Sequence, residues 1–305
     1  MKKIDLSIRY YFLWIVVYLS LVLLLPANKI VMSNYNLSTG QYHMLLLFVV
    51  LPYIGIWFAA FHGYGTIRKY SYSIRNTPEG PNFQTLSNGF TWLAWSLPIA
   101  AVSSLLQNSY ATSNTRFGGA SIIVNDYLAL LLPLIGFVLI RKSSHRLLSA
   151  AKLSINKSVA SMIGAGFAVL GVAYCYLTFR HLDLSSISNS NNPYNLPNWL
   201  VLISLTIPFL ASWFIGLIAA FEIFIYSKES TGLLYRRALM LLAFGVLAVI
   251  ISLVVLEYLT VVSPHRGFLS LNYQLVITYA IRIFSAIGYV LIVVGAHRLK
   301  RIEEV

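Results

Sequence analysis

Eight long apolar stretches dominate this sequence, and they restrict the fold more than any other feature. We place them at residues 10–26, 43–63, 89–107, 122–141, 158–179, 198–226, 238–262 and 273–297. A helix of about 20 residues spans the hydrocarbon core of a bilayer, and a helix satisfies all of its backbone hydrogen bonds internally. The sequence therefore predicts an all-α, polytopic membrane protein with eight transmembrane helices.

The composition agrees with a chain that is solvated mainly by lipid. Hydrophobic residues make up 58% of it and charged residues only 10%, whereas about a quarter of a soluble protein is charged. A net charge of +13 would suggest nucleic-acid binding in a soluble protein. Here the cations flank the apolar stretches, so we expect membrane lipids and no nucleic acid as partners. Cys175 is the single cysteine, which excludes an internal disulfide and a cysteine metal cluster.

The distribution of lysine and arginine predicts the orientation. If the N-terminus is cytoplasmic, 17 of the 22 Lys and Arg residues lie in cytoplasmic segments, as the positive-inside rule requires. Both termini are then cytoplasmic. We interpret residues 10–26 as a retained helix, because no small-residue cleavage site follows them. The longest connection, about Tyr64 to Asn88, is too short for a soluble domain. These features predict a multi-pass plasma membrane protein, most compatible with a bacterial inner membrane.

An internal repeat predicts how the helices are organised. Ile135–Leu147 (IGFVLIRKSSHRL) recurs as Ile287–Leu299 (IGYVLIVVGAHRL), with eight of thirteen positions identical. Other positions match at similar offsets: Pro52 with Pro208, Trp57 with Trp213, and Gly89 with Gly245. We predict a tandem duplication of four helices, with residues 1–149 as the first half and 150–305 as the second half. Both halves begin on the cytoplasmic side, so they are parallel.

Three ionisable residues within the predicted spans are candidates for a ligand-binding site. Arg282 lies near the middle of the eighth span, while Asp126 and Glu257 lie near the outer ends of the fourth and seventh. Charges inside a membrane are costly and usually functional, and a long arginine can reach carboxylates nearer the surface. The repeat gives none of the three a charged counterpart, which favours one central pocket. The alternative is a structural ion pair that docks the seventh helix on the eighth.

This cluster predicts a carrier or binding protein for a small molecule or ion, with its site in the outer half between the fourth, seventh and eighth helices. Two further residues, His62 and Glu222, occupy equivalent places near the cytoplasmic ends of the second and sixth helices. They are candidates for proton handling. The alternative is that both residues lie at the headgroup boundary and have no special role.

Other chemistries have little support in the sequence. All six histidines fall at predicted helix ends or in loops, whereas axial haem ligands lie within helices, so we expect no cofactor. No nucleotide-binding, zinc-protease or nucleophile-elbow motif is present, and nothing favours catalytic or metal-binding residues or an enzyme. The second functional hypothesis is a non-catalytic membrane subunit that docks a protein partner through its basic cytoplasmic loops, chiefly residues 141–157.

Overall fold

The computed structural model describes residues 51–113, 116–153, 198–230, 232–252 and 271–303, together with residues 161, 165, 166 and 169. Within these ranges the secondary structure is all-helical, as predicted, and comprises α4 (Leu51–Ser73), α5 (Gly80–Ser113), α6 (Arg116–Ala150), α9 (Asn198–Glu229), α10 (Leu233–Ile250) and α12 (Leu271–Glu303). These helices correspond to the second, third, fourth, sixth, seventh and eighth predicted spans. The first predicted span, and nearly all of the fifth, lie outside the described residues.

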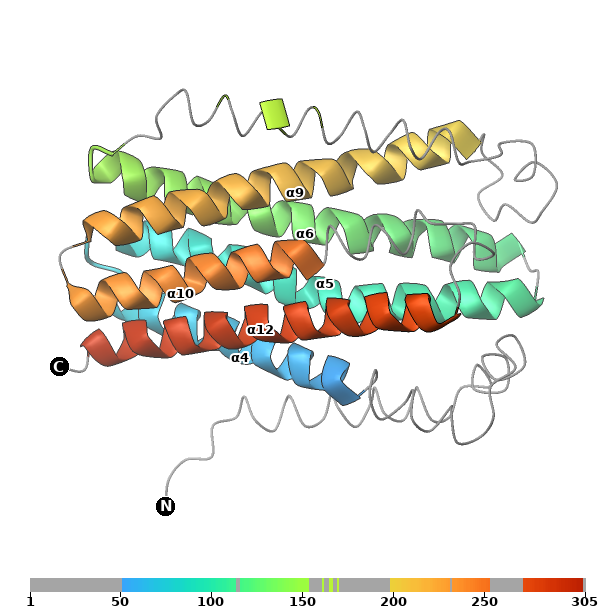
Figure 1. Cartoon of the computed structure of the whole chain (residues 1–305), viewed down its shortest axis with the longest axis horizontal. Helices are drawn as coiled ribbons and strands as arrows, with labels where there is room; N and C mark the ends of the chain where they lie inside the picture. Colours follow the sequence, from blue (N-terminus) through green and yellow to red (C-terminus); the bar gives the residue numbers. More distant parts are fainter. Residues whose placement is uncertain are drawn as a thin grey trace, which may run out of the picture.

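The six helices run alongside one another (Figure 1). Their mutual contacts close into a ring. Going around the ring, the order is α4, α5, α6, α9, α10 and α12, and α12 packs back against α4. The first predicted half contributes the consecutive helices α4, α5 and α6, and the second contributes α9, α10 and α12. The predicted halves therefore meet at two interfaces, α6 with α9 and α4 with α12.

The helices extend farther than hydropathy predicts. The prediction of a connection from Tyr64 to Asn88 is wrong, because only residues 74–79 separate α4 from α5. Hydropathy marks the segment that contacts lipid, but a helix continues for as long as one of its faces stays buried against neighbouring helices. Phe83 and Leu86 are buried in the first turns of α5, and Leu147 and Leu148 are buried in the last turns of α6. Residues 141–150 are therefore part of the bundle, and their apolar side faces the protein.

Glycines bring two pairs of helices into backbone contact. A Cβ atom at Gly89 in α5 would lie 2.8 Å from the carbonyl oxygen of Gly136 in α6. A Cβ atom at Gly245 in α10 would lie 2.8 Å from the carbonyl oxygen of Gly288 in α12. Small residues allow this kind of close approach between membrane helices. The same contact thus occurs once among the helices of each predicted half.

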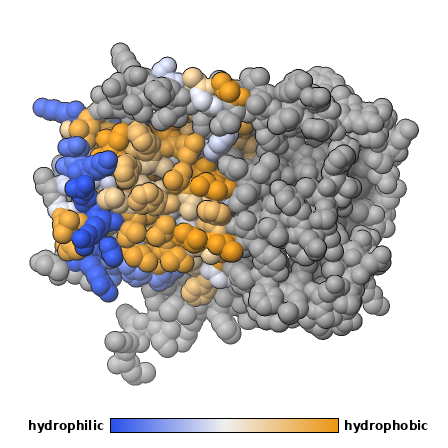
Figure 2. Space-filling model, viewed as in Figure 1, coloured by the Kyte–Doolittle hydropathy of each residue, from blue (hydrophilic) through white to orange (hydrophobic). Residues whose placement is uncertain are grey.

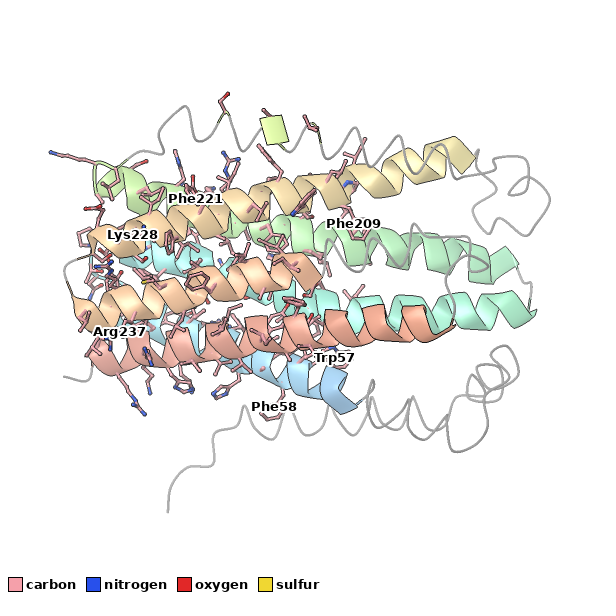
Figure 3. The ribbon with its side chains drawn as sticks, viewed as in Figure 1. Trp57, Phe58, Phe209, Phe221, Lys228 and Arg237 are labelled. Atoms are coloured by element: carbon pink, nitrogen blue, oxygen red, sulfur yellow. The ribbon has the colours of Figure 1, made fainter. Side chains whose placement is uncertain are left out.

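The surface changes character along the bundle. Figure 2 shows an apolar band in the middle of the visible face and a hydrophilic band at one end. The exposed cations of this second band, which we call the basic end, belong to all six helices or their flanking turns: Arg68, Lys69, Arg75, Arg141, Lys142, Arg146, Lys152, Lys228, Arg236, Arg237, Arg298 and Arg301. Figure 3 labels two of them, Lys228 and Arg237, at that end.

Three described segments are long and apolar enough to cross a membrane: Ile207–Glu229, Leu233–Ile250 and Ile283–Ile302. Together with the apolar band on the surface, they identify a helical membrane protein. The full set of eight spans and the duplication stay predictions.

The glycine contacts give a direct prediction for stability. Gly89→Ala and Gly245→Ala should each lower the free energy of unfolding by about 1–3 kcal/mol, because the added methyl group meets backbone atoms that cannot move away freely. Gly55→Ala is the matched control, since a Cβ atom there would have no neighbour within 4 Å. Denaturant unfolding in detergent measures all three variants. Equal stability of Gly89→Ala and Gly55→Ala would contradict the close contact.

Candidate functional site

The predicted charged cluster falls largely outside what the structure describes. Glu257 lies outside the described residues, and so do the side chains of Asp126 and Arg282, whose backbone positions belong to α6 and α12. The helix order adds one constraint on the cluster. Because α6 and α12 take opposite positions in the ring, a site that uses both residues requires side chains that extend across the ring interior. The cluster itself stays a prediction.

Glu222 lies in a polar contact between α9 and α6, close to the basic end. Its side chain is 2% exposed. One carboxylate oxygen, Oε2, accepts a hydrogen bond of 2.5 Å from the Ser144 hydroxyl. The other, Oε1, lies 3.3 Å from Nδ1 of His145, whose side chain is 70% exposed. A buried carboxylate is tolerated only when polar groups replace its hydration. Ser144 and His145 provide them here, and both come from the other predicted half.

His62 makes the corresponding contact between α4 and α12. Its Nε2 atom lies 2.9 Å from Nε2 of His297, and the ring centroids are 5.1 Å apart. A hydrogen bond between two imidazole nitrogens needs one ring to donate and the other to accept, so at least one ring is neutral. The two predicted proton-handling residues therefore do not contact each other, and each is paired with a histidine from the other half.

These two pairs use equivalent histidines. His145 and His297 are the histidines of the repeated His-Arg-Leu sequence at the ends of Ile135–Leu147 and Ile287–Leu299. His145 reaches from α6 to Glu222 on α9, and His297 reaches from α12 to His62 on α4. In the structure each of these histidines joins the two predicted halves, because α6 and α12 are the helices at which the halves meet.

A third polar contact between the halves was missed by sequence reasoning. Glu79, in the turn before α5, accepts hydrogen bonds from the hydroxyl groups of Tyr226 on α9 (2.8 Å) and Tyr235 on α10 (2.9 Å). Residue 79 is separated by 147 positions from the first tyrosine and by 156 from the second. No local motif can indicate a contact of that sequence separation. The only available signal was a single acidic residue in a turn that follows three cations, Arg68, Lys69 and Arg75.

Within the described residues, no group of three or more His, Cys, Asp or Glu side chains is arranged to hold a metal ion. The His62–His297 pair supplies only two nitrogen ligands, while structural zinc sites use four protein ligands and catalytic sites use three.

Comparisons with models of known families, with curated proteins and with solved structures found no match to this chain.

The contact at Glu222 predicts the effect of removing its carboxylate. Glu222→Ala should lower the free energy of unfolding by about 0.5–1.5 kcal/mol, because the Ser144 hydroxyl loses its hydrogen bond to the carboxylate and keeps only the backbone oxygen of Arg141 as an acceptor. Glu229→Ala, at an exposed position on the same helix, is the matched control and should leave stability unchanged. Denaturant unfolding in detergent distinguishes the two. A Glu222→Ala variant as stable as the control would show that the contact contributes nothing.

Proposed function

We propose that this protein is a membrane carrier for a small molecule or ion, built from two parallel four-helix halves that move relative to each other. The observation that carries the proposal is the placement of the His145–Glu222 and His62–His297 pairs, one at each interface between the halves and both near the basic end. In carriers made of repeated halves, one half rocks against the other around a central site. Polar pairs at both interfaces are suited to hold such halves together at one end.

Polar pairs are well suited to contacts that must open and close. When an apolar interface opens toward water, its side chains cannot form hydrogen bonds with the water that enters. Hydrogen-bonded and ionic pairs can exchange their partners for water when the halves separate, so their net contribution is small. Of the two paired side chains, the His145 ring is already exposed, whereas Glu222 is buried. The two pairs, together with Glu79 and its tyrosines, would act as a reversible closure of the cytoplasmic side.

The proposal includes eight membrane spans and a tandem duplication. The glycine contact between Gly89 and Gly136 and the one between Gly245 and Gly288 have the same geometry, as expected if each half is a copy of one ancestral unit. The order of helices around the ring is also the same in each half. Cations concentrated at one end support a cytoplasmic location for that end in a multi-pass plasma membrane protein.

The binding site itself is proposed to be formed by Asp126, Glu257 and Arg282 in the outer half. The opposite positions of α6 and α12 in the ring support a central location. Because the three charges have no charged counterparts in the repeat, they would form one site in the interior. His62 and Glu222 would take part in closing the cytoplasmic side and are the candidates for proton binding there.

A second candidate function is a non-catalytic subunit that docks an acidic protein partner. One observation favours it, namely that exposed cations from all six described helices or their flanking turns gather at the basic end. Such a surface attracts acidic partners as well as anionic lipid. A docking subunit does not need its halves to move, and this difference separates the two candidates.

Motion of the halves can be measured with a pair of spin labels. Gln84→Cys on α5 and Arg237→Cys on α10 place labels at exposed positions on opposite sides of the ring, after the single native cysteine is changed by Cys175→Ser. Electron–electron double resonance should show two distances. Adding His62→Ala with Glu222→Ala should shift the population about five- to 150-fold toward the longer distance, because the two lost contacts together contribute about 1–3 kcal/mol.

The control for this experiment is Glu229→Ala, which removes an exposed acid and should leave the distances unchanged. A single narrow distance that is the same in every variant would overturn the carrier and favour the docking subunit.

Occupancy of the outer-half site can be measured by native mass spectrometry of protein gently extracted from its own membrane. A small ligand should accompany the chain, and Glu257→Gln should release it, because removal of one carboxylate alters the charge that binds it. Glu229→Gln is the control and should retain the ligand. Retention of the ligand by Glu257→Gln would disprove the outer-half site. Recovery of a second protein in place of a small ligand would favour the docking subunit.

A further inference from the structure

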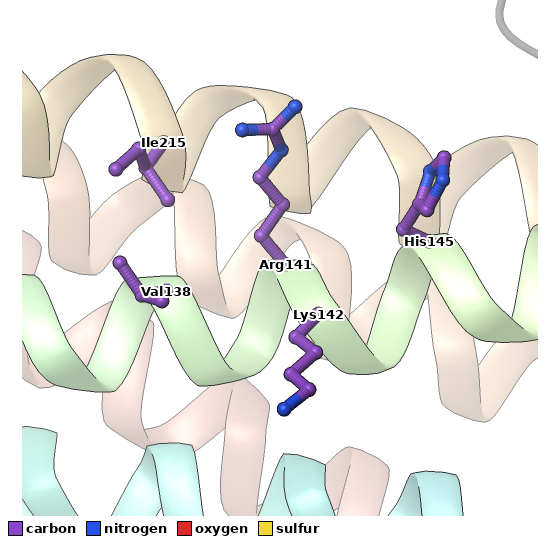
Figure 4. A pocket seen from close by; sticks show the side chains of 5 residues that line it. All are labelled: Val138, Arg141, Lys142, His145 and Ile215. Carbon is purple, nitrogen blue, oxygen red and sulfur yellow. The ribbon is translucent and has the colours of Figure 1, made fainter.

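A hollow between α6 and α9 lies beside the Glu222 contact. Its volume is about 270 Å³, and it is lined by Val138, Arg141, Lys142, His145 and Ile215 (Figure 4). The four α6 residues are spaced at i, i+3, i+4 and i+7, so they share one face of the helix. The surface that lines the hollow is almost entirely apolar, so the three basic residues line it mainly through their carbon atoms.

The same face of α6 continues as an exposed apolar stripe away from the basic end. Leu131, Ile135 and Val138 follow one another at helical spacing, and they are 39%, 39% and 43% exposed. Large aliphatic side chains that are this exposed on a membrane helix face hydrocarbon. The stripe leads directly to Arg141 and His145. One continuous surface is therefore apolar along its length and basic where it ends.

We propose that this surface binds one anionic phospholipid, with an acyl chain along the stripe and in the hollow, and with the phosphate group at the edge of the hollow beside Arg141 and His145. Arg141 and His145 both point toward α9 in Figure 4, whereas Lys142 points away from it at the edge. A guanidinium group suits phosphate because its N–H groups form a planar fork. In addition, Nδ1 of His145 is turned toward Glu222 at 3.3 Å, so Nε2 is the ring nitrogen that a bound phosphate would meet.

Charge complementarity decides which lipid this is. Three basic residues line the hollow, and one of them, His145, is paired with the buried Glu222. Arg141 and Lys142 together outweigh that one acid, so the net charge beside the hollow is positive. A zwitterionic headgroup brings a cation that these side chains would repel, while an anionic headgroup brings only negative charge. A basic pocket between membrane helices at the cytoplasmic side is a known setting for anionic headgroups. The occupant is therefore an anionic phospholipid of the leaflet at the basic end.

The repeated segment on α12 can be compared with the one on α6, and the comparison predicts one lipid site in the chain instead of two. The positions equivalent to Arg141 and Lys142 are Val293 and Val294 on α12. The apolar stripe recurs there, with Ile287 and Val290 exposed by 47% and 52%, but the two cations that would receive a phosphate group are replaced by valines. Lipid can coat this second stripe without being held at its end. The stoichiometry should be one tightly bound lipid per chain.

The test is a titration of the full chain in detergent with phosphatidylglycerol, followed by native mass spectrometry. One lipid should bind more tightly than the rest, and phosphatidylcholine should bind at least tenfold more weakly. Arg141→Gln should weaken phosphatidylglycerol binding about fivefold, since one cation near anionic lipid contributes about 1 kcal/mol. Arg141→Gln with Lys142→Gln should weaken it further. Arg146→Gln is the matched control, because it removes an exposed cation of the same helix that does not line the hollow.

Three outcomes would overturn the proposal. Equal weakening by Arg141→Gln and Arg146→Gln would show that only overall charge matters. Equal affinity for phosphatidylcholine would show that the hollow does not select an anionic headgroup. Competition by inorganic phosphate at concentrations similar to those of the lipid would identify a site for a free anion instead. Circular dichroism spectra of the variants establish that each one remains folded.

Discussion

Backbone contact at glycine joins α5 to α6 and α10 to α12, and close packing of this kind is the constraint on which a membrane bundle depends. Membrane helices gain little from hydrophobic burial against one another, because lipid is as apolar as their side chains. Close packing must therefore stabilise the bundle. Gly89 against Gly136 and Gly245 against Gly288 allow this packing at two equivalent places. The two interfaces between the predicted halves, α6–α9 and α4–α12, contain different polar side chains.

The α6–α9 and α4–α12 interfaces each contain a histidine paired with a polar side chain of the other helix. At one of them His145 and Ser144 surround the Glu222 carboxylate, and at the other His62 pairs with His297. The histidines are equivalent in the repeat, but their partners are an acid in one case and a base in the other. Protonation of a histidine strengthens its pairing with a carboxylate and weakens its pairing with a second histidine.

The proposed lipid site and the proposed closure share His145. A phosphate group bound by Arg141 and His145 would lie between helices from both halves, since α6 belongs to the first half and α9 to the second. Bound lipid would then favour whichever arrangement of the halves keeps the hollow intact. The two proposals remain independently testable, because spin-label distances report motion and lipid titration reports binding.

The sequence by itself determined that this is a helical membrane protein, because the length and apolarity of a span are local properties. It located each described helix approximately, and the repeated segment identified two equivalent histidines. It placed the ends of α5 and α6 incorrectly, since those turns are held by burial against neighbouring helices. Only the tertiary structure decided that Glu222 pairs with His145, that His62 pairs with His297, and that Glu79 binds two tyrosines. Such partners are far apart in the chain, and the order of helices around a ring is fixed by packing, which no local pattern encodes.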